Sequence, residues 1–190
     1  MNTILEHFTY HKTRVWDIHE HMETLYEYSK ECEHITEMGV RDVVSTWAFL
    51  LANPKKLTCY DVQQCPVGEA TRLAAETGIQ FEFKTADTAA DNFVIEETDL
   101  LFIDTWHIYE QLRKELALHA KNTRKYIIMH DTTLFGEENC KEFYHCSVKP
   151  EGVYTGLWPA VEQFLAENKD WELKERFTNC NGLTILKRVS

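Results

Sequence analysis

Asp99-Leu100-Leu101-Phe102-Ile103-Asp104 is the stretch that decides the fold, because a wholly apolar run lies between two aspartates. Such a run is typical of a strand that is covered on both faces inside a parallel sheet. Tyr126-Ile127-Ile128-Met129 repeats the pattern, and between the two runs apolar residues recur on one helical stripe: Ile108, Leu112, Leu116 and Ala120. Residues 99–131 therefore predict a strand, a helix and a second strand, with both strands in the middle of a sheet.

The residues before this unit alternate between strand-like and helix-like runs. Strands are expected at 34–38, 56–61 and 79–83, and helices at 43–52 and 69–77. This order requires a mostly parallel sheet with helices on both faces. Ahead of it, one N-terminal helix is expected within residues 13–33, since five residues are spaced as one helical face: Val15, Ile18, Met22, Leu25 and Ser29.

The residues after Asp131 depart from this alternation until a helix that is expected to start near Pro159. So long an interruption is either a functional lid or disordered, and five aromatic residues favour an active-site lid over 132–158: Phe135, Phe143, Tyr144, Tyr154 and Trp158. Strands are expected at 171–178 and 183–187, and their short connection predicts a hairpin. The chain is therefore expected to form a seven-stranded, mostly parallel α/β sheet with an antiparallel last strand.

The composition fits one domain over residues 1–190, with 44% hydrophobic and 27% charged residues. A net charge of −11 at pH 7 argues against a nucleic-acid partner. No apolar stretch is long enough for a membrane span, and residues 1–7 lack the pattern of a secretion signal, so a cytoplasmic location is expected. The six cysteines include no C-x-x-C pair, so neither a disulfide framework nor a zinc ribbon is expected.

Candidate binding residues follow the first two strands, where open α/β sheets bind ligands. Gly39 allows close approach of the backbone, and the helix start after it can donate amides. Asp61 lies at roughly the 20-residue offset from Gly39 at which a carboxylate accepts hydrogen bonds from ribose hydroxyls. A nucleoside site is favoured over the alternative, a tight turn beside a solvated aspartate. Arg41 and Val44 replace later glycines of a G-x-G-x-x-G motif, so NAD is a minor candidate.

Polar residues also follow the next three strands. Asp87 and Thr88 are expected either to bind a purine or to cap a helix. Asp104 and His107 follow the fourth strand, and His130-Asp131 follows the fifth. Two histidines and two aspartates at adjacent strand ends match a catalytic base or an oxygen-rich metal site. His107 is favoured as the base, because a free imidazole with a pKa of about 6.5 is largely neutral at pH 7.

Four segments resemble class I S-adenosylmethionine (SAM)-dependent methyltransferases, above all the small-molecule and sugar O-methyltransferases akin to the macrocin and cephalosporin-tailoring enzymes. The resemblance covers residues 13–188, and its segments are Glu37-Met38-Gly39-Val40-Arg41, Cys59-Tyr60-Asp61, residues 99–107 and Tyr126-Ile127-Ile128-Met129-His130-Asp131-Thr132. It implies the Rossmann-like fold of that class. It also implies a SAM site, with the expected contacts Glu37, Gly39, Val40, Arg41, Ser45, Thr46, Asp61, Asp87, Thr88 and Asp104.

The resemblance further implies where the parts of the reaction lie. Glu37 and Gly39 would contact the methionine part of SAM, Asp61 the ribose and Asp87 the adenine, while His107 would be the base. Relatives often hold a magnesium ion with an acid matching Asp104 and an acidic pair after the fifth strand. This chain has His130-Asp131 there, so Mg²⁺, Mn²⁺ or no metal at Asp104, His130 and Asp131 all remain open.

The expected activity is methyl transfer from SAM to a hydroxyl of a small molecule, with a sugar or glycan favoured by the resemblance. His107, Asp104 and Asp131 are the expected catalytic residues, and Trp106, Tyr109 and His130 are the expected acceptor contacts. Two alternatives stay open: an NAD-dependent oxidoreductase and a nucleoside-binding module without chemistry. The expected partner is the acceptor itself, and whether the chain forms a homodimer is also open.

Overall fold

The computed structural model describes residues 1–152 and 155–189, and in this part of the chain seven strands form one sheet in the order β3-β2-β1-β4-β5-β7-β6. Neighbours from β3 to β5 are parallel, whereas β7 is antiparallel to both β5 and β6. The strands are β1 (His34–Met38), β2 (Lys56–Asp61), β3 (Gln80–Thr85), β4 (Thr98–Ile103), β5 (Thr123–His130), β6 (Trp171–Phe177) and β7 (Leu183–Arg188). The expected topology, including the antiparallel last strand, is confirmed.

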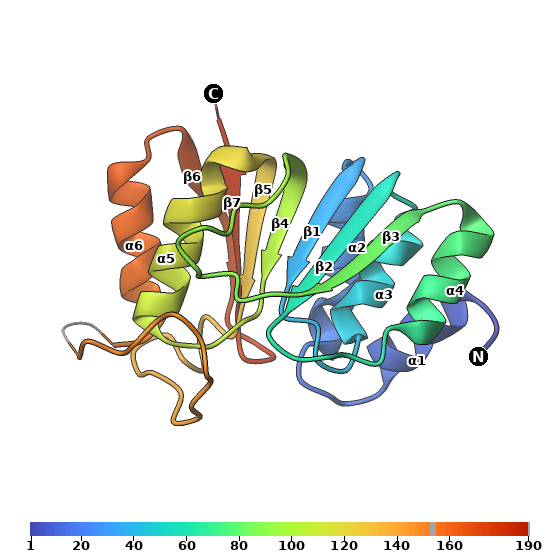
Figure 1. The fold of residues 1–190 in the computed structure, drawn as a ribbon, viewed down its shortest axis with the longest axis horizontal. Coiled ribbons are helices and arrows are strands. Elements are labelled where there is room, and N and C mark those ends of the chain that lie inside the picture. The colour runs from blue at the N-terminus through green and yellow to red at the C-terminus, as the bar shows by residue number, and fades with distance from the viewer. Residues whose placement is uncertain (153–154, 190) are drawn as a thin grey trace.

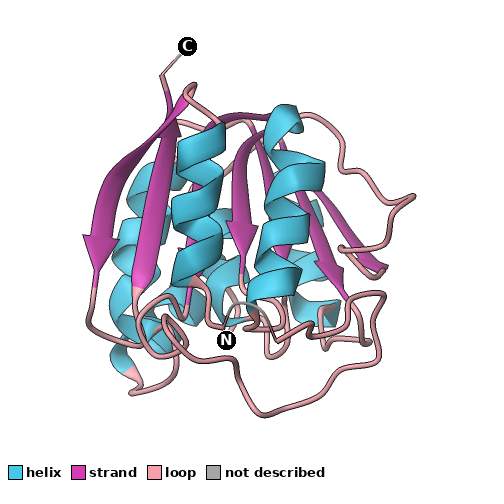
Figure 2. Cartoon of the chain, turned by 90° about the vertical axis from the view of Figure 1, so that its left-hand side faces the viewer, coloured by secondary structure: helices cyan, strands magenta, loops and turns pink. Residues whose placement is uncertain are grey.

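Helices cover both faces of the sheet (Figures 1 and 2). Four helices pack with one another on one side, α1 (Ile4–Thr13), α2 (Met22–Ser29), α3 (Val44–Leu51) and α4 (Gly68–Thr77). The other side carries α5 (Tyr109–His119) and α6 (Trp158–Glu167). Short 3₁₀ turns at His19–His21 and Ala120–Asn122 complete the helical elements of the described residues. None of the described helices is long and apolar enough to cross a membrane.

The apolar run of β4 is explained by this layering. Leu100 and Phe102 belong to the core cluster beneath α1 to α4, whereas Leu101 and Ile103 belong to the cluster beneath α5 and α6. Successive side chains of a strand point to opposite faces, and here both faces are covered. All four side chains are therefore buried, with at most 3% of their surface exposed.

The N-terminal expectation of a single helix is wrong. The helix α1 begins after Thr3, whose side chain forms a capping box with Glu6, and α2 begins only at Met22. Between them the chain crosses the carboxyl edge of the sheet, and Val15 is 83% exposed there. The apolar stripe from Ile18 to Ser29 is buried as expected, but Val15 is not part of it.

The segment after β5 contains no helix or strand within the described parts of 131–157. It is fastened by backbone bonds, from Thr133 and Leu134 to the carbonyl oxygen of Asn181 and from Cys140 to that of His107. In Figure 1 it lies at the lower left, below α5 and α6. Of the five aromatic residues expected in the lid, Tyr154 lies outside the described residues and Trp158 is the first residue of α6. All six cysteines are free, as expected.

Candidate active site

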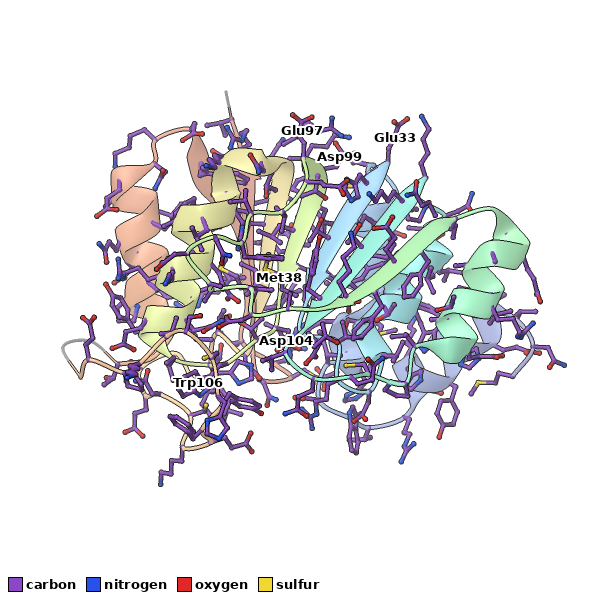
Figure 3. The ribbon with its side chains drawn as sticks, viewed as in Figure 1. Glu33, Met38, Glu97, Asp99, Asp104 and Trp106 are labelled. Atoms are coloured by element: carbon purple, nitrogen blue, oxygen red, sulfur yellow. The ribbon has the colours of Figure 1, made fainter. Side chains whose placement is uncertain are left out.

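A cavity of about 470 Å³ lies at the carboxyl edge of the parallel strands. Figure 3 places Asp104 and Trp106 at this edge, while Glu33, Glu97 and Asp99 lie at the opposite one. The wall is built by residues that follow β1, β2, β3 and β4, by Gln111 of α5, and by two segments on the outside. These outer segments are residues 16–18 of the N-terminal crossing, and Tyr144 and Cys146 of the stretch after β5. The cavity thus has the position that α/β sheets use for ligands.

Gly39 brings the ends of β1 and β4 together. It has φ +86°, and a Cβ atom there would lie 1.9 Å from the carbonyl oxygen of Asp104. No side chain fits at that distance, so the position requires glycine. The close approach expected of Gly39 is therefore made to the backbone of Asp104, and it fixes Asp104 at the cavity wall.

Asp61 holds the turn that follows Gly39. Its Oδ2 atom accepts hydrogen bonds from the backbone amides of Val40, at 2.8 Å, and Arg41, at 3.0 Å. Its Oδ1 atom accepts one from Gln63, at 2.9 Å. The Cys65 thiol also forms a hydrogen bond with this carboxylate. Asp61 lines the cavity while it holds the turn, and the nucleoside site stays a prediction.

Glu37 and Thr46 were expected to contact the cofactor, but neither lines the cavity. Glu37 is fully buried and accepts hydrogen bonds from Ser45, Thr46 and Cys59. Burial raises its pKa to about 7, against the opposing effect of these three donors. Of this group only Ser45 reaches the cavity wall. Glu37 is therefore held inside the protein by these donors at the end of β1, outside the cavity wall.

Asp87 and Thr88 both line the cavity beyond the end of β3. Asp87 accepts hydrogen bonds from the backbone amides of Ala89 and Ser147, and the second bond ties the stretch after β5 to the cavity rim. No helix occurs within 86–97, all of which is described, so the helix-cap alternative is wrong. Asp87 therefore holds two segments at the cavity rim, and its contact with a purine stays a prediction.

His107 lies between two carboxylates. Its Nε2 atom is 3.1 Å from Asp104 Oδ1 and 3.0 Å from Asp131 Oδ2. Phe135 stacks on the imidazole, with ring centroids 4.8 Å apart and planes 9° from parallel. The four expected titratable groups do converge, since His130 Nδ1 lies 3.5 Å from Asp104 Oδ2 and 3.7 Å from Asp131 Oδ1. Asp104 and His107 line the cavity, whereas His130 and Asp131 lie behind them.

Charge balances within this cluster. Burial disfavours the charged imidazole of His107, but Asp104 and Asp131 outweigh burial and raise its pKa. Burial also opposes ionisation of Asp104, but the two histidines outweigh burial and lower its pKa. Asp131 differs, because burial and the charge of Asp104 raise its pKa. The two carboxylates thus shift His107 toward its charged form relative to a free imidazole.

The fit of a metal ion rests on two buried atoms without a hydrogen-bond partner, His130 Nδ1 and Asp131 Oδ1. His130 Nε2 donates to the carbonyl oxygen of Cys180 at 3.0 Å, and Nδ1 faces Asp104 and Asp131. Burial lowers the pKa of His130, but the charges of these two aspartates outweigh burial and raise the pKa to about 9. The ring is therefore protonated at pH 7, and a metal ion at Nδ1 would have to displace that proton. Asp17, which sequence reasoning missed, joins His130 and Asp131 in one group of candidate ligand atoms within 4.8 Å. This mixed nitrogen and oxygen set suits Mn²⁺ better than Mg²⁺.

The expected acceptor contacts are only partly brought together. Trp106 lines the cavity, and its indole Nε1 donates to the carbonyl oxygen of Glu142 at 2.9 Å. Tyr109 does not line the cavity, because its hydroxyl turns to Gln163 of α6. Sequence reasoning missed Trp16, Asp17 and Gln111, since the crossing segment was assigned to a helix and Gln111 carries no motif.

Comparisons with known proteins bear on the fold. No protein-family model matches the sequence, and no curated protein does. The O-methyltransferase TomG from Streptomyces achromogenes, involved in tomaymycin synthesis and solved with SAM, aligns with 98% of this chain and 89% of its own, at a TM-score of 0.63 and 15% identity. An O-methyltransferase from Bacillus cereus, solved with S-adenosylhomocysteine (SAH), aligns over the same shares at 0.63 and 13% identity. The N-methyltransferase NodS from Bradyrhizobium japonicum covers 90% of this chain and 96% of its own, at 0.56 and 16% identity. These likenesses show that the chain has the Rossmann-like class I methyltransferase fold.

Proposed function

We propose that this protein is a SAM-dependent methyltransferase that transfers the methyl group to a hydroxyl of a small molecule. The observation that carries the proposal is that a single cavity is lined both by residues suited to a nucleoside and by residues suited to proton transfer. Gly39, Asp61 and Asp87 line one part of it, and Asp104 and His107 line another. A nucleoside cofactor and a base would therefore meet in the same space. TomG and the Bacillus cereus enzyme, which are O-methyltransferases with this fold, support the choice of chemistry.

The cofactor is assigned along the wall in the order of the strands. Asp61, a carboxylate that lines the cavity, suits a ribose hydroxyl. Asp87 and Thr88 suit the adenine, and the turn from Gly39 to Arg41 suits the methionine part. This order puts the sulfonium carbon on the side of the cavity where Asp104 and His107 lie.

Methyl transfer is a displacement at carbon, for which alignment of the two reactants supplies much of the rate. The acceptor oxygen bonds to the methyl carbon as the carbon–sulfur bond breaks, and the bonding electron pair leaves with sulfur, which gives SAH. The hydroxyl proton passes to the His107 ring in its neutral form, which the raised pKa of His107 makes less abundant than in a free imidazole. Asp104 and Asp131, at 3.1 and 3.0 Å, stabilise the imidazolium that forms. The structure groups the candidate ligand atoms of Asp131 either with Asp17 and His130 or with Asp104 and His107, and not as the expected set of Asp104, His130 and Asp131. A divalent ion that Asp104 and Asp131 would hold would make the acceptor hydroxyl more acidic.

The acceptor class is inferred from the outer wall. Trp16, Trp106 and Tyr144 provide aromatic surface, and Asp17 and Arg41 provide polar groups beside it. Flat aromatic faces beside hydrogen-bonding groups suit a sugar, whose ring has apolar faces and a polar rim. A sugar or a glycan is therefore the proposed acceptor.

Two measurements test the proposal. Titration calorimetry with SAH and with NAD separates the cofactor classes, and binding of NAD without binding of SAH would overturn the assignment. A screen of sugars, glycosides and phenols with radiolabelled SAM, with and without a chelator, then identifies the acceptor class and the dependence on metal.

The variant His107→Ala tests the base. We expect turnover to fall by roughly 10²- to 10⁴-fold, the usual contribution of a general base, while SAH affinity changes little. His145→Ala is the matched control, because His145 is exposed and lies outside the cavity wall. Unchanged turnover of His107→Ala would remove His107 from the role of base.

A further inference from the structure

Glu115 of α5 is a buried carboxylate that the proposed reaction does not use. It is fully buried, and its oxygens accept hydrogen bonds from the hydroxyls of Thr88 and Thr105 and from the Gln111 amide. Within the described residues no basic side chain pairs with it. A carboxylate is costly to bury unless its lone pairs are satisfied, and here three neutral donors satisfy them.

All three donors to Glu115 line the cavity, although Glu115 itself does not. A threonine hydroxyl has a single proton, and the protons of Thr88 and Thr105 are both directed to Glu115. The Gln111 amide nitrogen gives one of its two protons to Glu115, at 2.8 Å, and keeps the other, while its Oε1 atom is contacted by the Cys146 thiol at 3.7 Å. Glu115 therefore leaves the two threonine hydroxyls as hydrogen-bond acceptors toward any ligand.

Two further side chains at the same end of the cavity agree with this polarity. Asp87 offers only carboxylate oxygens. The Cys146 thiol contacts Gln111 Oε1 at 3.7 Å and the carbonyl oxygen of Val148 at 3.9 Å, so its proton is also directed away from a ligand. Apart from one N–H of Gln111, the polar side chains named here thus offer acceptors to the cavity, which suits a ligand group that donates.

We infer that Glu115 is a positioning residue that makes this end of the cavity select a purine carrying an exocyclic amino group. The inference rests on the proposed function, which assigns the adenine to Asp87 and Thr88. The amino group of adenine donates two hydrogen bonds. Hypoxanthine has an oxygen at the same place, and its lone pairs would face those of the wall. Leaving the hypoxanthine oxygen and the acceptors of the wall without donors in a buried site weakens binding by roughly 10- to 100-fold.

The test compares SAH with S-inosylhomocysteine, in which an oxygen replaces the adenine amino group. Titration calorimetry at pH 8.5 keeps Glu115 ionised, since burial raises its pKa to about 7. We expect the wild type to prefer SAH by at least about tenfold. In Glu115→Gln the side-chain amide donates to one threonine, whose hydroxyl proton then becomes free for the ligand. The preference should fall at least about fivefold, mainly through tighter binding of the inosyl compound.

Glu110→Gln is the matched control, because Glu110 is also buried on α5 but does not line the cavity. This variant should prefer SAH over the inosyl compound as strongly as the wild type does. Equal loss of affinity for both ligands in Glu115→Gln would reduce Glu115 to a structural role and overturn the inference. If that variant does not fold, Thr88→Val, which removes one acceptor, must itself narrow the preference. A wild type that binds both ligands equally overturns the inference alone, whereas one that binds neither overturns the proposed function as well.

Discussion

At the scale of single residues, Gly39 shows how one missing side chain joins two strands. Its Cα lies so close to the backbone of Asp104 that any Cβ would overlap the carbonyl oxygen. Its amide also donates to the carbonyl oxygen of Tyr60 at 2.9 Å, and the amide of Asp104 donates to that of Met38 at 2.8 Å. The ends of β1, β2 and β4 are therefore locked at one point. The sequence identified Gly39 but could not show that its neighbour is the protein's own backbone.

Gly39→Ala should destabilise the protein by roughly 2–5 kcal/mol, because it combines a left-handed backbone with an overlap that requires the backbone to move. The matched change is Gly68→Ala at the start of α4, where a Cβ would meet nothing within 4 Å. That change should be neutral or stabilising by up to about 1 kcal/mol. Urea denaturation measures both, and equal midpoints for the two variants would contradict the role given to Gly39.

Glu37 predicts a pH dependence of stability. Its pKa is about 7 in the folded protein against 4.5 for a free glutamate, so the folded state holds the proton over a range in which the unfolded state has lost it. Stability should therefore fall as pH rises from about 4.5 to 7, by about 3 kcal/mol for this group. Glu37→Gln removes this contribution, so the unfolding free energy of the variant relative to wild type should rise by about that amount between pH 5 and 8.

The control for this prediction is Glu172→Gln, a change at an exposed carboxylate of β6. Its unfolding free energy, measured by urea denaturation across the same pH range, should follow the wild-type curve. A Glu37→Gln curve that also runs parallel to the wild type would show that Glu37 is not held in its protonated form.

At the scale of elements, the strands were predictable and the outer walls of the cavity were not. Each strand shows its pattern locally, as the double-sided burial of Leu101 and Phe102 illustrates. The crossing segment around Trp16 and Asp17 shows no such pattern, because Val15 has helical spacing yet is exposed. Its place at the cavity depends on contacts with distant residues. Asp17, for example, binds Arg41 at 3.1 Å and Asn181 at 2.6 Å.

The segment expected to act as a lid is anchored by Asn139. Its Oδ1 atom accepts hydrogen bonds from the backbone amides of Tyr109, at 3.1 Å, and Gly156, at 2.7 Å, and so ties the segment to the start of α5. Asn139→Ala should speed amide hydrogen exchange across residues 137–152, with a loss of stability of about 1–2 kcal/mol. Exchange in β1 and β4 should not change.

Asn122→Ala is the matched control for the lid. Asn122 also bridges two segments through its side chain, by donating to the carbonyl oxygen of Ile95 at 2.7 Å, but Ile95 lies in the connection between β3 and β4. This variant should leave exchange across 137–152 unchanged. The same exchange pattern in both variants would mean that Asn139 does not anchor the segment.

At the scale of the whole molecule, the topology was predictable because each strand-helix-strand unit and the final hairpin fix the relative direction of their strands. A strand, a helix and a parallel strand leave little choice of arrangement, and the five-residue connection between β6 and β7 favours a hairpin. The charge distribution was only half predictable, since the net charge of −11 does not say where the acids lie. Five of these acids line the cavity: Asp17, Asp42, Asp61, Asp87 and Asp104. Among the described residues, Arg41 is the only permanently charged cation that lines it.

This acidic wall predicts that the cavity distinguishes SAM from SAH by charge. SAM carries a net positive charge through its sulfonium, whereas SAH is neutral, so the field of the wall favours the substrate and assists release of the product. Salt screens such a field. Raising NaCl from roughly 50 to 500 mM should weaken SAM binding by about threefold or more and leave SAH binding nearly unchanged, as measured by titration calorimetry without acceptor. Asp42→Asn changes an exposed acid that lines the cavity, and it should reduce the difference in salt dependence between SAM and SAH binding. Equal salt dependence of the two ligands in the wild type would show that the field of the wall does not act on the sulfonium charge.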